Sequence, residues 1–187
     1  VRPGQQDAGL LPEVRTVPAV SADRRVDELC RVTEENVNLA ICSGDQITNI
    51  YTAETHFVLR PNFPLYQPFP AHCTGTGRVF LSHMSEAAQK WVYENNADAI
   101  GMSQEEFLAL LRKARKDGYA RDDQAFNAGL RCVAAPIYLG GGKLLFALSI
   151  SAPTARMDDA AYENARKLVL KYAELISQEI QSVEFRF

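Results

Sequence analysis

The sequence predicts an α+β fold in which helices flank an antiparallel sheet. Alternating apolar patterns occur in pairs that are joined by short turns, at Gly44-Asp45 and at Gly140–Gly142. Strands joined by such short turns pair antiparallel. Segments with apolar residues at three- and four-residue spacing, which is typical of helices, precede, separate and follow these pairs. Helices packed on an antiparallel sheet make an α+β sandwich.

The bulk composition limits the classes of function. The 187 residues are 47% hydrophobic and 23% charged, which indicates a globular chain of one domain with some additional length. A net charge of −3 argues against nucleic-acid binding by this chain, because phosphate contacts need a concentrated basic face. No apolar run approaches the roughly 18 residues of a membrane span, and no signal peptide is visible. We therefore expect a cytoplasmic protein without a membrane partner.

The four cysteines indicate a reducing compartment. Cys30, Cys42, Cys73 and Cys132 form no CxxC pair and no metal-like cluster. They are interpreted as reduced, mostly buried thiols of a cytosolic protein. No structural or catalytic metal is expected.

The N-terminal segment is predicted to be a linker or tail. Residues 1–20 are rich in Pro, Gly, Ala and Val and have weak periodicity, with a possible short helical turn near Leu10–Val17. Ser21 is the expected N-cap of a helix over about Ala22–Glu34. Residues 21–187 are expected to form the folded domain.

The first strand pair follows this helix. Val37 to Cys42 alternate between apolar and small or polar residues, and Gln46–Ala53 is the expected return strand. A third, shorter strand is expected at Thr55–Arg60. Prolines then predict irregular structure from Pro61 until His72.

Three helices are expected in the middle of the chain. The first begins in His72–His83 and the second covers Ser85–Asn95. The third opens with Ser103 and Glu106, which have the spacing of a capping box. Gly118 is expected to end it in the left-handed conformation.

The last third of the chain is predicted as a loop, a strand pair and a long helix. Tyr119–Leu130 is charged and contains turn residues, so it is interpreted as a loop. Strands are expected at Arg131–Tyr138 and Lys143–Ser151. Asp158 is the expected N-cap of a final helix that reaches about Gln181.

One face of the last strand has the composition of a binding site. Alternation places Leu144, Phe146, Leu148 and Ile150 on the core face and Ser149 and Ser151 on the other, about 7 Å apart. An ordinary solvent-facing polar row would have the same pattern. Small residues at Cys132 and Ala134 on the neighbouring strand leave volume on that face, which favours a ligand site.

The segment that enters the central helix offers hydrogen-bond donors. Thr74, Gly75 and Thr76 stand at its start, where unpaired N–H groups favour an anion. The motif is weak, since it has neither the GxGxxG fingerprint nor a Walker sequence, and the glycine could simply pack against the sheet. Asp122 and Asp123 are adjacent aspartates, which in a loop are usually solvated or cap nearby N–H groups. The alternative is that one of the two carboxylates turns inward and accepts a ligand hydroxyl.

An enzyme is not expected. Cys73 or Cys132, together with His72 and Asp122, would supply the residue types of a thiol-based catalytic triad. Nothing in the sequence places these residues in contact. No zinc motif such as HExxH occurs. The sequence therefore predicts no catalytic residue and no cofactor.

Several segments resemble the IclR-type transcriptional regulators. The similarity covers about residues 20–181. The segments that carry it, in the family's order, are Val37–Ala40, Pro70–Arg78, Gly118–Asp122, Gly129–Pro136 and Leu148–Pro153. The last one matches a Ser-x-Ser-Gly-Pro ending, with Ala152 where glycine is usual.

The resemblance implies a fold and a missing part. It implies a GAF- or profilin-like effector-binding domain with a curved antiparallel sheet and flanking helices. It also implies an N-terminal winged helix-turn-helix that binds operator DNA, for which residues 1–20 are too short. We therefore expect this chain to be the effector-sensing half of a regulator. Operator DNA would be bound only by a winged helix-turn-helix domain that is absent from this chain. Relatives form oligomers, so a homodimer or homotetramer is expected.

The resemblance also implies which residues of this chain contact a small-molecule effector. The turn Thr74–Thr76 would offer backbone donors to a carboxylate, and Asp122 would accept from a hydroxyl or hydrated keto group. Cys132 would line the floor, and Ser149 and Ser151 would donate to oxygen atoms.

Apolar wall positions complete the expected site. These are Phe69 and Leu130. The nearby aromatic residues Phe57, Phe63 and Tyr66 favour an aromatic or longer effector, unless they simply seal a loop. The expected function is the sensing of an organic or aromatic acid. The alternatives are a GAF-fold thiol enzyme such as a reductase, or a pure dimerisation module.

Overall fold

The computed structural model describes residues 17–184 and has one six-stranded sheet with the strand order β3-β2-β1-β6-β5-β4. Every neighbouring pair of strands is antiparallel. The elements in chain order are α1 (Val17–Thr33), β1 (Asn36–Ser43), β2 (Gln46–Ala53), β3 (Pro68–Pro70), α2 (Gly75–Leu81), α3 (Glu86–Ile100), α4 (Gln104–Asp117), β4 (Ala120–Asp123), β5 (Leu130–Tyr138), the 3-10 turn η2 (Gly140–Gly142), β6 (Leu144–Pro153) and α5 (Asp159–Glu184).

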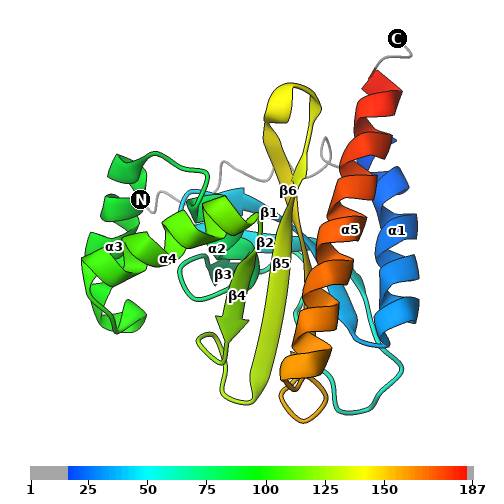
Figure 1. The fold of residues 1–187 in the computed structure, drawn as a ribbon, viewed down its shortest axis with the longest axis horizontal. Coiled ribbons are helices and arrows are strands. Elements are labelled where there is room, and N and C mark those ends of the chain that lie inside the picture. Colours follow the sequence, from blue (N-terminus) through cyan, green and yellow to red (C-terminus); the bar gives the residue numbers. More distant parts are fainter. Residues whose placement is uncertain (1–16, 185–187) are drawn as a thin grey trace, which may run out of the picture.

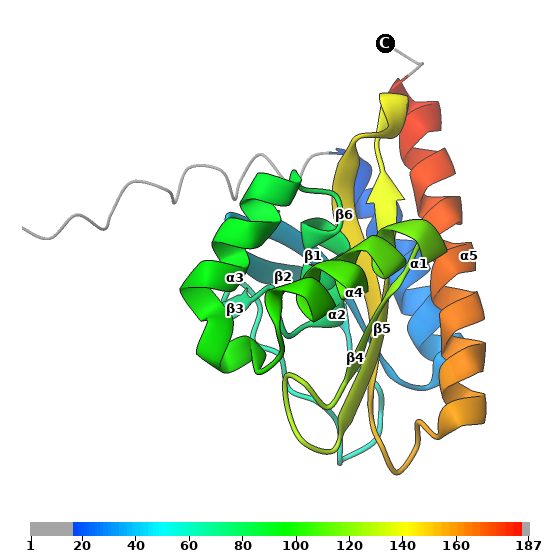
Figure 2. The same ribbon diagram turned by 60° about the vertical axis from the view of Figure 1, so that its left-hand side comes forward.

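Helices cover both faces of the curved sheet. Figure 1 shows α1 and α5 side by side on one face, and Figure 2 shows α2, α3 and α4 gathered on the other. The expected α+β fold with an antiparallel sheet and flanking helices is therefore confirmed. Among the described residues, no helix is both long enough and apolar enough to cross a membrane.

The sheet separates two hydrophobic cores. Leu148 and Ile150 of β6 are fully buried in the core beneath α1 and α5, as alternation predicts. Ala147 belongs to the second core, beneath α2 and α4. The face expected for Leu144 is wrong, because Leu144 packs against the second core and Leu145 packs against the first. The cause is a register shift, because Ile137 pairs with Phe146 but Tyr138 pairs with Leu144, which leaves Leu145 as an extra residue.

The first helix begins earlier than the sequence predicts. Ser21 lies inside α1 rather than at its N-cap, and the helix starts at Val17. Pro18 is compatible with this start, because the N–H groups of the first turn have no partner within a helix. Apart from residue 17, the short turn expected near Leu10–Val17 lies outside the described residues. The division into a linker and a domain stays a prediction.

The strand expected at Thr55–Arg60 is wrong. The N–H group of Thr55 donates to the side chain of Asn36 at 2.8 Å, instead of to a neighbouring strand. The edge strand is β3, within the segment where prolines predict irregular structure. A three-residue edge strand tolerates Pro68 and Pro70 because few of its N–H groups are needed for pairing.

The helices of the middle segment are confirmed with changed ends. α2 begins at Gly75 instead of His72, with Thr74 as its N-cap. α3 continues to Ile100 and ends at the left-handed Gly101. The capping box of Ser103 and the left-handed C-cap at Gly118 are both present in α4.

The last third of the chain differs from the prediction mainly in one short strand. The expected loop Tyr119–Leu130 contains β4, which pairs with β5. The carboxylate of Asp158 accepts from the N–H group of Ala161 at 2.8 Å and caps α5 as expected. The helix continues to Glu184, slightly beyond the expected end.

Candidate functional site

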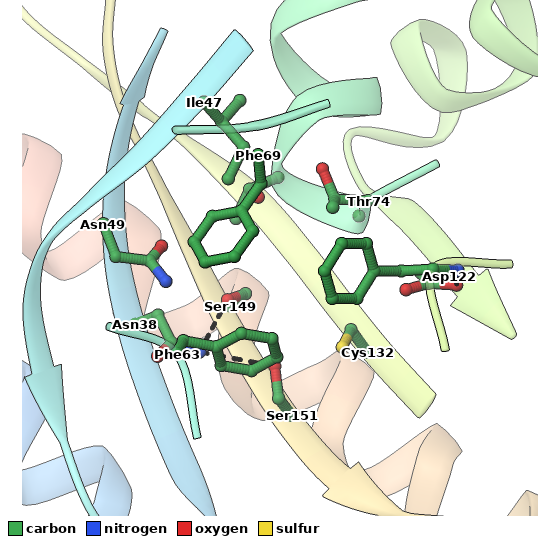
Figure 3. Close-up of a pocket in the computed structure, with 13 residues that line it drawn as sticks. Asn38, Ile47, Asn49, Phe63, Phe69, Thr74, Asp122, Cys132, Ser149 and Ser151 are labelled. Carbon is green, nitrogen blue, oxygen red and sulfur yellow. Dashed lines mark hydrogen bonds between the residues drawn. The ribbon is translucent and has the colours of Figure 1, made fainter. Parts of the chain in front are cut away.

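A small cavity of about 30 Å³ lies between the sheet and the start of α2. Figure 3 shows side chains from β1, β2, β5 and β6 converging on it. The lining residues are Asn38, Ile47, Asn49, Phe63, Phe69, Thr74, Gly75, Thr76, Asp122, Phe126, Cys132, Ser149 and Ser151. We call this space the inner cavity. Eight of the nine positions expected to contact an effector line it, and Leu130 is the exception.

A buried amide organises the two serines. Asn38 lies opposite Ser149 in the β1–β6 pair, and its Nδ2 donates to the hydroxyl oxygens of Ser149 and Ser151, both at 3.3 Å. Thr52 donates to the Oδ1 of Asn38 at 3.1 Å, which fixes the orientation of the amide. Each serine hydroxyl therefore accepts from Asn38. The Ser149 hydroxyl keeps its own hydrogen for another acceptor, whereas Ser151 also hydrogen-bonds to the thiol of Cys132. At 4% and 2% exposure, these serines are not a solvent-facing row.

A second asparagine on β2 has an uncommitted side chain. Asn49 is 4% exposed and lines the inner cavity, toward which its amide points in Figure 3. Among the described residues, none forms a hydrogen bond with this amide. Its polar atoms are still reached by solvent, because among the described residues no fully buried side-chain nitrogen or oxygen lacks a hydrogen-bond partner. The amide therefore offers both donors and an acceptor to anything that enters the cavity.

Asp122 is a buried carboxylate with a structural task. It is 1% exposed, and its Oδ1 accepts from the N–H groups of Ala125 at 2.8 Å and Phe126 at 3.3 Å. Burial raises the pKa of Asp122, against the lowering effect of these N–H donors and of the Arg78 guanidinium. Asp123, its neighbour, is half exposed and pairs with Arg131. The inward carboxylate of the pair is thus Asp122, and it also caps its own loop.

The start of α2 differs from the expected donor turn. The hydroxyl of Thr74 accepts from the N–H group of Gly77 at 3.1 Å and donates to the carbonyl of Pro70 at 3.3 Å. This side chain is therefore occupied as the N-cap. Gly75 and Thr76 follow it on the wall of the cavity. Because α2 has seven residues, its dipole adds little to anion binding.

Cys132 forms the floor of the inner cavity. It pairs with Ser151 across the β5–β6 ladder and is 6% exposed. Burial raises its pKa to about 12, with a further contribution from the Asp122 charge. The thiol is therefore protonated near neutrality and is a poor nucleophile.

The hypothetical thiol triad is not formed, because Asp122 and Cys132 lie together in the β4–β5 pair but His72 does not join them. Burial raises the pKa of Cys73, and the Sγ atom donates to the carbonyl of Pro70 at 3.6 Å. Burial and the Arg78 charge lower the pKa of His72. Within the described residues no hydrogen bond joins His72 to either thiol. In the same part of the chain, no group of three His, Cys, Asp or Glu side chains is arranged to hold a metal ion.

Three phenylalanine rings close the inner cavity. Phe63, Phe69 and Phe126 contact one another, with ring centroids 6.0 Å, 6.1 Å and 5.7 Å apart. Phe69 comes from β3, whereas Phe63 and Phe126 come from loops. The rings of Phe63 and Phe69 lie over the polar residues of the cavity in Figure 3.

A larger open hollow lies on the other side of two of these rings. It has a volume of about 370 Å³, and we call it the outer hollow. Its lining residues are Leu59, Arg60, Pro61, Asn62, Phe63, Phe126, Asn127, Ala128, Gly129, Leu130 and Pro153. Leu130 therefore lies at an apolar wall, as expected, but the wall belongs to the hollow.

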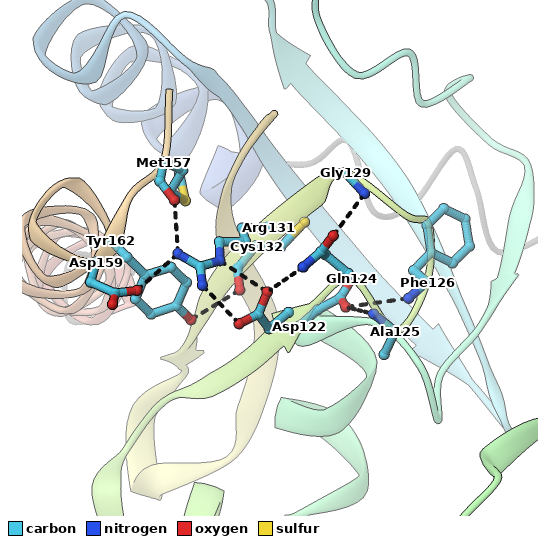
Figure 4. Close-up of polar contacts among 11 residues, drawn as sticks. Asp122, Gln124, Ala125, Phe126, Gly129, Arg131, Cys132, Met157, Asp159 and Tyr162 are labelled. Carbon is cyan, nitrogen blue, oxygen red and sulfur yellow. Dashed lines mark hydrogen bonds and ion pairs between the residues drawn. The ribbon is translucent and has the colours of Figure 1, made fainter. Parts of the chain in front are cut away.

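The loop that carries Phe126 is held at both ends by polar contacts (Figure 4). The guanidinium of Arg131 pairs with Asp123 at 2.9 Å and with Asp159 at 3.0 Å, which ties β4 and β5 to the start of α5. The Oε1 of Gln124 accepts from the N–H group of Gly129 at 3.1 Å and closes the loop.

Some lining residues were not among the expected contacts. Asn38 has a visible sequence signal, because a polar amide alternates there with the apolar residues of a strand. Asn49 has the same signal in the return strand. Phe126 has none, since an aromatic residue in a charged loop shows no periodicity.

Comparisons with known proteins agree on one family. The family model described as "Bacterial transcriptional regulator IclR C-terminal" matches residues 17–178. The HTH-type transcriptional regulator BhcR of Paracoccus denitrificans is 31% identical over 154 residues, which are 80% of this chain and 55% of BhcR. KdgR of Escherichia coli is 27% identical and is covered over 65% of its length, so the chain spans between about half and two thirds of these relatives.

Solved structures give the same result. A transcriptional regulator from Rhodococcus sp. RHA1 has a TM-score of 0.80 and 25% identity, over 92% of this chain and 69% of that one. The C-terminal domain of E. coli KdgR has a TM-score of 0.73 and 26% identity, over 88% of this chain and 98% of that one. The relatives are named as regulators of transcription and not as enzymes. This chain belongs to the IclR family of bacterial transcriptional regulators and corresponds to the family's C-terminal domain.

Proposed function

We propose that this chain senses a small organic or aromatic acid for an IclR-type regulator in the cytoplasm. Occupancy of the inner cavity would bias operator binding by a winged helix-turn-helix outside residues 1–187. The observation that carries the proposal is the set of polar groups that converge on one buried cavity. The amide of Asn49 and the hydroxyl hydrogen of Ser149 face the same space as the Ser151 hydroxyl and the Asp122 carboxylate.

The donors and the acceptor suit a hydroxy acid or a hydrated 2-oxo acid. The hydroxyl of such a ligand donates to Asp122, and its carboxylate accepts from Ser149, Ser151 and Asn49. The main chain of Gly75 and Thr76 is a further expected donor. Cys132 lies beneath the ligand without reacting.

The signal needs an affinity difference between two states of the regulator. A ligand shifts an equilibrium only by as much as its binding differs between the states. Couplings of this kind are typically about 1–3 kcal/mol. In a homodimer or homotetramer, as the family resemblance suggests, the bias would reach several DNA-binding heads together.

A thermal-shift screen tests the sensing function. The probes are L-lactate, pyruvate, benzoate and L-3-phenyllactate, each with the wild type and with the double variant Ser149→Ala/Ser151→Ala. A ligand at about 100 times its Kd stabilises the folded state by about 2.7 kcal/mol. We expect at least one acid to raise the Tm of the wild type, and the double variant to lose at least tenfold in affinity.

The control and the contrary outcome are specific. Ser182→Ala makes the same substitution on the exposed side of α5 and should leave the affinity unchanged. Equal affinity in the wild type, the double variant and Asp122→Ala would refute the assignment of the site. No shift with any acid would favour a pure dimerisation module.

A further inference from the structure

The inner cavity is too small for the ligand that its chemistry suits. A volume of about 30 Å³ holds about two water molecules. Sites for small molecules are commonly about 300–1,000 Å³. An organic acid therefore enters only if some part of the wall moves.

The movable part of the wall is the ring pair Phe63 and Phe126. Both side chains come from irregular segments, whereas Asn38, Cys132 and Ser149 project from paired strands. The same two rings line the outer hollow, whose volume of about 370 Å³ falls within the usual range for ligand sites. Displacing them joins the two spaces without disturbing the sheet.

The outer hollow has the chemistry of a neutral tail site. Its lining is mostly apolar, with Leu59, Ala128, Leu130 and prolines among the residues. Its one charged lining residue among those described, Arg60, is paired with Glu54 at 2.8 Å and donates to the carbonyl of Phe57. The hollow therefore offers no unpaired charge to a second acidic group.

Asp122 contacts both the proposed site of the ligand's head and the segment that carries the Phe126 ring. The main-chain N–H of Phe126 donates to Asp122, which is also the acceptor proposed for the ligand hydroxyl. At 3.3 Å this bond is the longer of the two that Asp122 accepts, the other being 2.8 Å from Ala125. Both bonds reach Oδ1, so Oδ2 of the same carboxylate is left to accept the ligand hydroxyl, and this carboxylate couples the head site to the main chain of Phe126.

We propose that the outer hollow is the second half of the effector site. The acid's polar head occupies the inner cavity, and a neutral aromatic or branched aliphatic tail passes between Phe63 and Phe126 into the hollow. This inference rests on the proposed sensing function and narrows the ligand to acids longer than the inner cavity.

Matched short and long acids test the tail site. L-lactate and L-3-phenyllactate share a hydroxy-acid head and differ by a phenyl ring. We expect the wild type to bind L-3-phenyllactate at least tenfold more tightly in isothermal titration calorimetry. Ala128→Trp places a large side chain in the hollow from an exposed position and should abolish that advantage without changing the affinity for L-lactate. Ala99→Trp, exposed on α3, is the matched control and should keep it.

Cysteine labelling tests the ring pair without any ligand. Cys132 lies in the inner cavity, so iodoacetamide reaches it only when the rings separate. Phe126→Ala should raise the labelling rate of Cys132, followed by peptide mass spectrometry, at least tenfold. Trp91→Ala removes an exposed aromatic ring on α3 and should leave the rate unchanged. Melting curves of both variants exclude general unfolding as the cause.

The outcomes separate the two proposals. If L-lactate binds in an Asp122-dependent manner but L-3-phenyllactate binds no more tightly, the tail site is wrong and the sensing function stands. The tail site is also wrong if Ala128→Trp weakens the binding of both acids equally or weakens the binding of neither. If Cys132 is labelled equally fast in the wild type and in Phe126→Ala, the rings are not a gate. If neither acid binds any variant, the tail site is wrong, and the sensing function falls as well if pyruvate and benzoate also give no thermal shift.

Discussion

At the scale of single residues, the carboxylate of Asp122 carries opposing electrostatic influences. Burial favours its protonated form, while two N–H donors and the nearby Arg78 favour the charged form. Burial is the largest effect, so the folded-state pKa lies above the ordinary value. The folded protein therefore holds a proton on Asp122 in a pH range where the unfolded chain has already lost it.

This difference predicts a pH-dependent effect of Asp122→Asn. Stability falls as pH rises from the unfolded-state pKa, about 3.9, through the raised folded-state pKa. The asparagine keeps an oxygen that accepts from Ala125 and Phe126 but does not titrate. We expect the stability of the variant relative to the wild type to increase from pH 3.5 to pH 7, as measured by urea denaturation.

The neighbouring carboxylate supplies a control of opposite sign. Hydrogen bonding to Arg131 lowers the pKa of Asp123. Its contribution to stability is therefore present above the unfolded-state pKa and is lost as pH falls through the folded-state value. Asp123→Asn should lose stability relative to the wild type as pH rises through that window. Parallel pH profiles for both variants and the wild type would contradict this electrostatic account.

Residue-level prediction worked where alternation alone decides the direction of a side chain. Ser149, Ser151 and Cys132 lie on the expected face because their strands are regular there. The hydrogen bonds of Asn38 were not predictable in this way. They depend on β1 pairing with β6, whose residues are 111 positions away in the sequence. Whether these side chains bind a ligand stays a prediction.

At the scale of elements, α2 approaches the preceding turn too closely for a side chain at one position. A Cβ atom on Gly77 would lie 2.1 Å from the carbonyl oxygen of Ala71. A Cβ atom on Gly75 would lie 3.5 Å from the Cβ of Ala134, which is an ordinary contact. The two glycines of this segment therefore have different tasks, although they are two residues apart.

Alanine substitutions should separate these two glycines. Gly77→Ala forces the turn and α2 apart, and we expect it to destabilise the domain by at least about 2 kcal/mol in chemical denaturation. Gly75→Ala should be neutral or stabilising by up to about 1 kcal/mol, because alanine is the better helix former. Equal losses in both variants would show that the close contact at Ala71 relaxes without cost.

Element-level prediction failed for the short edge strands. The bounds of β2 and the capping box of α4 follow directly from local sequence patterns. β3 and β4 have three and four residues, which is too short for a readable alternation. Their extended conformation comes from pairing with β2 and β5, a long-range contact that the local sequence does not report.

At the scale of the whole molecule, one arginine connects three distant segments. Arg156, after β6, pairs with the buried Glu35 before β1, at 2.5 Å and 2.8 Å. It also donates to the carbonyl of Leu59 at 2.9 Å and lies 4.4 Å above the ring of Phe57. The long loop between β2 and β3 is thus attached, at the middle of the loop, to the segments that flank β1 and β6.

Arg156→Ala should release this loop. The substitution also leaves Glu35 buried without its cation, and we expect a loss of about 2 kcal/mol. Hydrogen exchange should accelerate at Thr55 and Phe57 more than in α5. Lys90→Ala breaks an exposed pair with Glu86 and should cost much less than Arg156→Ala. Uniform acceleration over the whole chain would argue against a local attachment.

The architecture as a whole was predictable because its two strand pairs are local and antiparallel. Their order within the sheet is not local, since β1 and β6 meet at the centre from opposite ends of the chain. The hydrophobic pattern does not predict that order, and the family resemblance was used only for a curved antiparallel sheet with flanking helices. The volume of the site was also beyond prediction, because it depends on how three rings from separate segments pack.

The alternation of β6 has a consequence for how such a domain diverges. Leu148 and Ile150 belong to the core beneath α1 and α5, while Ser149 and Ser151, which alternate with them, line the inner cavity. If the inner cavity binds the effector as proposed, substitutions at one set of positions change what is recognised, and substitutions at the other change whether the chain folds. A lineage can therefore acquire new chemical specificity by point mutation in this strand while selection for folding acts on the adjacent codons.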